Sequence, residues 1–153
     1  AFLYVGLGGR PGHSVVSGAL ITRERRRIAE MLRDWPPEAV EGVLDEAFSL
    51  WNAQELRSEF RWTWNTRLRT TAGRAFLREG RVELNPILLG RHPEAVRTVV
   101  IHEFAHLVAH RMRPREPGHG PAWRALMRAA GLRPRASHTL PVADLRRTRA
   151  LRG

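Results

Sequence analysis

The sequence predicts an α+β fold in which two helices precede a small three-stranded antiparallel sheet and two further helices follow it. Three observations predict this order. Apolar residues recur with helical spacing before residue 56 and after residue 93, they alternate with polar residues between residues 60 and 85, and glycine or proline stands at most junctions. No internal repeat is visible, and a chain of 153 residues suits one globular domain.

Two amphipathic helices are expected in the first part of the chain. Thr22 can cap a helix over residues 23–35, and Pro36 and Pro37 separate it from a second helix over residues 38–56. In both segments the apolar side chains fall on one stripe, as expected for helices that cover a core. The inward positions are Ile28, Met31, Leu32 and Trp35 in the first helix and Val40, Val43, Leu44, Phe48 and Trp51 in the second.

Three short strands are expected between residues 60 and 85. Trp62 and Trp64 alternate with polar neighbours, residues 70–77 give a second strand, and a turn at Gly80 leads to a third strand over residues 81–85. Because the strands are short and follow one another along the chain, the sequence predicts an antiparallel meander.

Two helices are expected after the strands. The longest apolar run follows Pro93 and predicts a helix that is buried on most sides. The last helix begins at Pro121 and ends at Gly131, since glycine suits the first position after a helix. We therefore divide the chain into an extension of unclear role over residues 1–21, a folded domain over residues 22–132 and a basic tail over residues 133–153.

The composition excludes several kinds of site. The chain has no cysteine, which excludes disulfides, thiolate metal sites and a cysteine nucleophile. No segment approaches the roughly 20 apolar residues of a membrane span, so we expect a cytoplasmic monomer without a membrane partner. The net charge of +11 favours a polyanion such as DNA as a partner of the basic surface. The exclusive use of arginine among the basic residues indicates coding bias.

His102, Glu103 and His106 form the motif that carries the predicted chemistry. Histidines at positions i and i+4 lie on one helix face about 5–6 Å apart at Cβ, so that both imidazoles can bind one metal ion. Glu103 lies on an adjacent face, where a carboxylate can take a proton from a metal-activated water. Burying these groups in an apolar helix without such a purpose is costly, which disfavours a purely structural interpretation.

A zinc site with two histidines needs a third protein ligand, and three residues compete for that position. His110 lies roughly 12 Å along the helix from His102, too far to share its ion, although it can face the site and support a ligand or the substrate. Glu116 stands in a turn between two prolines. His119 follows a Pro-Gly pair where the chain can reverse, and it precedes the helix expected to pack Trp123 beneath the site. We therefore predict His119 as the third ligand of one Zn²⁺ ion.

Several segments together resemble the SprT-like zinc metalloprotease domain, which includes bacterial SprT proteins and the catalytic part of Spartan, the eukaryotic DNA–protein crosslink protease. The resemblance covers about residues 38–132 in the expected order. Its strongest part joins Val99–His106 to Gly118–Met127, and it extends upstream to Leu50-Trp51-Asn52, Trp64–Arg74 and Val82–Leu89. The zinc ribbon that many relatives carry after the domain is absent, since the chain has no cysteine.

The resemblance implies a zincin-like fold, ligation of zinc by His102, His106 and His119, and Glu103 as the general base. The expected function is zinc-dependent endopeptidase activity on protein or peptide substrates, including proteins associated with DNA. We expect an extended substrate to pair with the sheet edge near Thr71 and Gly73. The alternative is an inactive, zinc-stabilised DNA-binding or scaffold protein, which would not need the carboxylate of Glu103.

Overall fold

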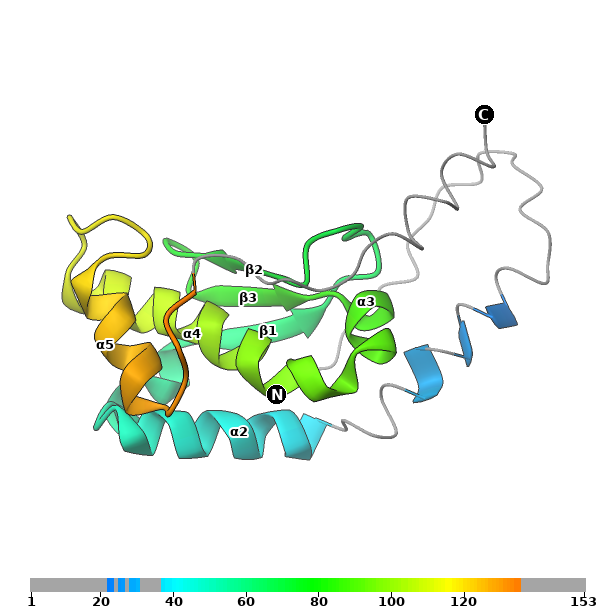
Figure 1. The fold of residues 1–153 in the computed structure, drawn as a ribbon, viewed down its shortest axis with the longest axis horizontal. Helices are drawn as coiled ribbons and strands as arrows, with labels where there is room; N and C mark the ends of the chain where they lie inside the picture. The colour runs from blue at the N-terminus through cyan, green and yellow to red at the C-terminus, as the bar shows by residue number, and fades with distance from the viewer. Residues whose placement is uncertain (1–21, 24, 27, 31–36, 136–153) are drawn as a thin grey trace.

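The computed structural model describes residues 22–23, 25–26, 28–30 and 37–135. The described part is a mixed α+β fold, as predicted (Figure 1). Its elements are, in order, α2 (Pro37–Leu50), the 3₁₀ helix η1 (Gln54–Glu59), β1 (Arg61–Trp64), β2 (Gly73–Phe76), β3 (Arg81–Leu84), α3 (Pro86–Arg91), the 3₁₀ helix η2 (Pro93–Ala95), α4 (Val96–Met112) and α5 (Pro121–Ala129).

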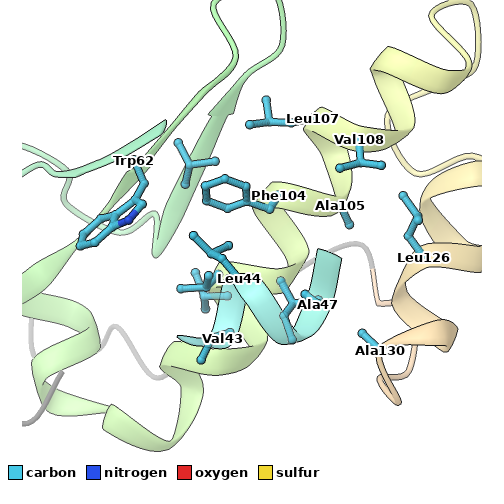
Figure 2. Packing of buried hydrophobic residues seen from close by; sticks show 14 of the residues in the cluster. Val43, Leu44, Ala47, Trp62, Phe104, Ala105, Leu107, Val108, Leu126 and Ala130 are labelled. Carbon is cyan, nitrogen blue, oxygen red and sulfur yellow. The ribbon is translucent and has the colours of Figure 1, made fainter. Parts of the chain in front are cut away.

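Helix α4 is the centre of the fold. It packs against α2 on one side, α5 on another, and strands β2 and β3 on a third (Figure 1). Figure 2 shows Leu44 of α2, Phe104 of α4 and Leu126 of α5 within this core. The apolar run of the sequence predicted this burial, because a helix covered on most sides needs apolar residues around most of its circumference. None of the helices in the described part is long and apolar enough to span a membrane.

Of the two predicted N-terminal helices, the first agrees with expectation in its described residues, whereas the second ends earlier than predicted. In the first, the described residues 23, 25, 26 and 28–30 are helical, and residues 31–35 lie outside the described part. The second ends at Leu50, so the prediction of a helix to residue 56 is wrong. Asn52 adopts φ 51°, and the N–H groups of Asn52 and Ala53 bond back to the carbonyls of Ser49 and Phe48, which closes the helix end.

The sheet is mixed, so the predicted antiparallel meander is wrong. Its strand order is β1-β3-β2, with β2 antiparallel to β3 and β1 parallel to β3. The hairpin turn at Gly80, whose φ is 63°, is present as expected. Residues 65–72, however, carry the chain past β3 to the opposite edge. Strand β3 thereby takes the central position, where Val82 and Leu84 are fully buried.

Asn85 fixes that crossing segment. Its Nδ2 donates to the carbonyls of Leu68, Arg69 and Thr71 over 3.1–3.3 Å, and its Oδ1 accepts from the backbone N–H groups of Ile87 and Leu88. Asn85 is fully buried, so every polar atom of its side chain needs such a partner. The same side chain caps α3, a short helix that was not predicted from the sequence.

Candidate metal centre

Helix α4 presents His102 and His106 on one face, one helical turn apart. Their Nε2 atoms lie 3.3 Å apart and their ring centroids 5.0 Å apart. His102 is only 4% exposed. Helical geometry alone brings the two rings together, as the i, i+4 spacing predicted.

The loop between α4 and α5 brings a third imidazole to the same point. The ring of His119 lies with its centroid 5.6 Å from that of His102 and 4.6 Å from that of His106. Each of the three histidines offers a ring nitrogen, and these nitrogens all lie within 4.8 Å of one another. The three residues predicted as ligands are therefore assembled in one cluster that could hold a metal ion.

The two other candidates for the third position lie outside this cluster. Glu116 turns towards the start of α5, where its Oε2 accepts a hydrogen bond from the backbone N–H of Ala122 at 2.9 Å. His110 is half-buried near the C-terminal end of α4 and is not part of the group of converging ligands. Of the three residues considered for the third position, His119 is the one that converges with His102 and His106 in the described part of the chain.

The arrangement fits zinc in its ligand type and spacing. Tetrahedral zinc with Zn–N bonds of about 2.0–2.1 Å requires about 3.3–3.4 Å between two ligand nitrogens. The Nε2 atoms of His102 and His106 already have this separation, at 3.3 Å. Three imidazoles leave a fourth position open, which is the pattern of catalytic rather than structural zinc sites.

Trp123 forms the floor of the cluster. Its ring centroid lies 4.9, 5.3 and 4.6 Å from those of His102, His106 and His119, and it stacks on His106 at an interplanar angle of 18°. Its indole N–H donates to the carbonyl of His102 over 3.2 Å. The sequence predicted that the helix after His119 packs Trp123 beneath the site, and these contacts confirm it.

Glu103 is buried against strand β2. It is 6% exposed, and a Cβ atom added to Gly73 would lie only 2.9 Å from Glu103 Cγ and 3.1 Å from Val99 Cγ1. Gly73 is therefore required for its lack of a side chain, because any Cβ there would displace the carboxylate. From the sequence, Gly73 was expected to allow close approach of a substrate backbone or to mark a bulge, and its fit against Glu103 was not predicted. Thr71 lies exposed in the segment that leads into β2.

The chain is similar in sequence to proteins of one known family. The sequence model described as "SprT-like family" matches residues 43–142. Protein SprT of Vibrio parahaemolyticus is 34% identical over 85 residues, 54% of this chain and 51% of the relative. Protein SprT of Photorhabdus laumondii is 43% identical over 59 residues, 38% of this chain and 30% of the relative.

These matches cover only part of each relative. The chain spans about half the length, or less, of the curated relatives it matches. No solved structure matches the chain. The family model nevertheless covers more than half of the chain, including α4, the loop and α5. On this ground the protein belongs to the SprT-like family.

Proposed function

We propose that this chain is a zinc-dependent metalloendopeptidase with a zincin-like fold. The observation that carries the proposal is the convergence of three imidazoles beside a buried carboxylate. His102, His106 and His119 would hold one ion, and Glu103 would remain available for proton transfer. Zinc at such a site supplies an acidified water and polarises the peptide carbonyl.

The chain's own groups would carry the remaining work. The carboxylate of Glu103 would accept a proton from the attacking water and return it to the leaving amine, the usual double role of a general base. Its burial against Gly73 supports this role, because the carboxylate is held in one place by packing. Trp123 closes the floor of the site and excludes water from beneath the ligands.

The substrate would bind as an extended strand. Within the described residues, β2 pairs with β3 on one side, and its other side is an edge of the sheet. An extended peptide could add to this edge through backbone hydrogen bonds, next to Glu103. Exposed Thr71 lies beside this edge, which supports its proposed contact with substrate, whereas Gly73 would contribute chiefly by making room for Glu103.

The decisive test is the Glu103→Gln variant. We expect zinc content to stay at the wild-type level. The rate of cleavage of an unfolded protein should fall by about 10²–10⁴-fold, the usual contribution of a general base. Glu55→Gln, the same chemical change at an exposed position of η1, serves as the control. Full cleavage by Glu103→Gln would refute the mechanism. Zinc binding without cleavage by the wild-type protein would favour the scaffold alternative.

We also propose that the basic surface contacts a polyanion such as DNA. The charges are segregated along the described chain. Acidic side chains concentrate in α2 and η1 (Glu38, Glu41, Asp45, Glu46, Glu55 and Glu59), whereas the loop before α5, that helix and the segment after it carry Arg113, Arg115, Arg124, Arg128, Arg133 and Arg135. Retention on immobilised DNA should fall steeply with added salt, since counterion release drives such binding. Retention that does not change with salt concentration would contradict the proposal.

A further inference from the structure

The loop that carries His119 is built from two tight turns. The N–H of Glu116 bonds to the carbonyl of Arg113 at 3.1 Å, and the N–H of Gly120 bonds to the carbonyl of Pro117 at 3.0 Å. Neither turn contains a large apolar side chain that would anchor it in the core. Glu116 is half-buried, whereas its neighbours Arg115 and Pro117 are exposed. The position of His119 therefore depends on the contacts that the Glu116 side chain makes.

Glu116 caps the N-terminus of α5 in place of the N-cap residue, which has no side chain. The N-cap residue is Gly120, which has no side chain, and Glu116 Oε2 instead accepts the N–H of Ala122 at 2.9 Å. A carboxylate is favoured here because the N-terminus of a helix carries partial positive charge. The fit is close, since a Cβ added to Gly120 would lie 3.2 Å from Glu116 Oε2 and 3.0 Å from the carbonyl of Pro117.

The hydrogen bond from Ala122 to Glu116 connects the chain before His119 to the chain after it. Glu116 precedes the histidine and Ala122 follows it, so the hydrogen bond closes a short loop with His119 inside. Beyond the closure, α5 continues directly to Trp123, which packs on the histidine ring with centroids 4.6 Å apart. The backbone of His119 is also held from α5, because Arg124 Nε donates to its carbonyl at 3.3 Å.

We propose that Glu116 is a positioning residue that holds His119 ready to bind the metal. The inference rests on the proposed function, because it presumes that the histidine cluster binds zinc. Without the cap, the loop is expected to sample arrangements in which His119 leaves the cluster, and the ordering of the loop then opposes binding. The carboxylate would act without binding the metal, since Glu116 lies outside the group of converging ligands and its Oε2 accepts the N–H of Ala122.

Two substitutions at position 116 separate positioning from ligation. Glu116→Ala removes the cap, and we expect zinc affinity to fall about tenfold, as for other groups that orient metal ligands. Glu116→Gln keeps an acceptor oxygen for the Ala122 N–H, so affinity should stay within about threefold of wild type. Arg115→Ala is the control at an exposed position of the same loop and should change nothing. Affinity is measured by competition with a chromophoric chelator, on proteins whose folding is checked by circular dichroism.

The absorption spectrum of the Co²⁺-substituted protein gives a second readout. We expect the same spectrum for wild type and Glu116→Gln, because the ligand set is unchanged. If Glu116→Gln loses affinity as strongly as Glu116→Ala and alters the Co²⁺ spectrum, Glu116 is a ligand and the inference is wrong. Wild-type affinity in Glu116→Ala would equally overturn it. If wild-type protein binds no metal, the proposed function fails instead.

Gly120→Ala covers the case in which Glu116→Ala does not fold. The added methyl would lie 3.2 Å from Glu116 Oε2 and 3.0 Å from the carbonyl of Pro117, so it would crowd the carboxylate against Ala122 without removing it. The backbone at Gly120, with φ −77° and ψ −172°, is open to alanine, so any effect comes from crowding of the Glu116 cap and of the Pro117 carbonyl in the turn that carries His119. Zinc affinity should fall in the same direction as for Glu116→Ala. Unchanged affinity in folded Gly120→Ala would overturn the inference.

Discussion

Helix α4 and the loop after it both contribute to the histidine cluster, but they are built in different ways. In α4, the spacing of His102 and His106 is set by continuous backbone hydrogen bonds, and the helix is enclosed by α2, α5 and the sheet. His119 lies in a loop of two turns that one carboxylate fastens to α5. Two ligands are therefore fixed by the core, while the third depends on a few polar contacts.

This difference indicates which part of the site can adjust. His102 and His106 cannot move without disturbing the packing of α4 in the core, so this pair of histidines is rigid. Its geometry therefore depends on the folding of the whole domain. The loop can change with little loss of buried apolar surface. Trp123 links the two parts, since it bonds to the backbone of His102 and packs on His119. We expect substitutions in α4 to affect folding and metal binding together, and those in the loop to affect metal binding alone.

The largest effects should come from the ligands themselves. His106→Ala and His119→Ala should each weaken zinc binding by more than the roughly 10–100-fold typical of residues that only orient a ligand. The melting temperature of the metal-free protein should change little for His119→Ala, because the loop contributes little to the core. Chelator competition and thermal unfolding measure the two effects.

A different pattern would break the comparison between helix and loop. His110→Ala is the matched control, because His110 lies on the same helix as the ligands but outside the cluster. Zinc that is lost from His110→Ala yet kept by His119→Ala would show that the third ligand comes from the helix rather than from the loop.

Gly73→Ala should lower turnover while leaving zinc in place. The new methyl would collide with Glu103 Cγ at 2.9 Å, so the carboxylate must shift. A displacement of about 1 Å at a reacting group can cost about 100-fold in rate, and we expect kcat to fall by that order. Zinc content is measured beside kcat to separate the base from the ligands.

Gly42→Ala is the control for that substitution. An added Cβ at Gly42 meets nothing within 4 Å, and alanine in an exposed helix position is stabilising. Its kcat should equal that of wild type. If Gly73→Ala also kept full kcat, Glu103 would have room to move and its proposed fixation by β2 would be wrong.

Trp123→Phe should have a smaller effect, on both parts of the site. Phenylalanine keeps a ring under the histidines but loses the hydrogen bond to the carbonyl of His102 and part of the packed surface. We expect the free energy of unfolding to fall by about 1–2 kcal/mol, which chemical denaturation measures. If both the free energy of unfolding and the zinc affinity were unchanged, Trp123 would not couple α4 to the loop that carries His119.

Local signals in the sequence predicted much of this structure. The apolar run predicted α4 and its burial, and Gly131 marked the end of α5. There the N–H groups of Gly131 and Leu132 bond back to Arg128 and Met127. The end of α2 was missed because the apolar stripe continues past Asn52, whose left-handed backbone stops the helix. The parallel pairing of β1 was missed because it depends on which strand occupies the centre of the sheet.

The residues of the candidate site also differ in how far the sequence predicts their positions. His102 and His106 come together through helix geometry, and the sequence contains that information fully. The contact of Trp123 with the histidines depends on how α5 packs on α4, and the close fit of Gly73 against Glu103 depends on how β2 packs on it. The helix after His119 was expected to place Trp123 beneath the site, but the fit of Gly73 against Glu103 does not follow from periodicity and was not predicted.

The smallest effect is expected away from both helix and loop, at Glu83 on β3. Burial raises the pKa of Glu83, but hydrogen bonds from Asn65 and Arg81, together with the positive charges of Arg81 and Arg74, outweigh it and hold the pKa below its usual value. A carboxylate whose pKa is depressed by folding stabilises the protein above its unfolded pKa of about 4.5, and this contribution is lost as the pH falls through the folded pKa.

Glu83→Gln should therefore lower the free energy of unfolding at pH 7 by less than about 1 kcal/mol, and the difference from wild type should shrink as the pH falls below 4.5. Denaturation at several pH values measures it, with Glu79→Gln, which removes another partner of Arg81, as the control. Zinc affinity at pH 7 should be unchanged. A loss of affinity comparable to that of a loop substitution would mean that the outer face of the sheet is coupled to the histidine cluster, and the two-part description of the site would have to include β3.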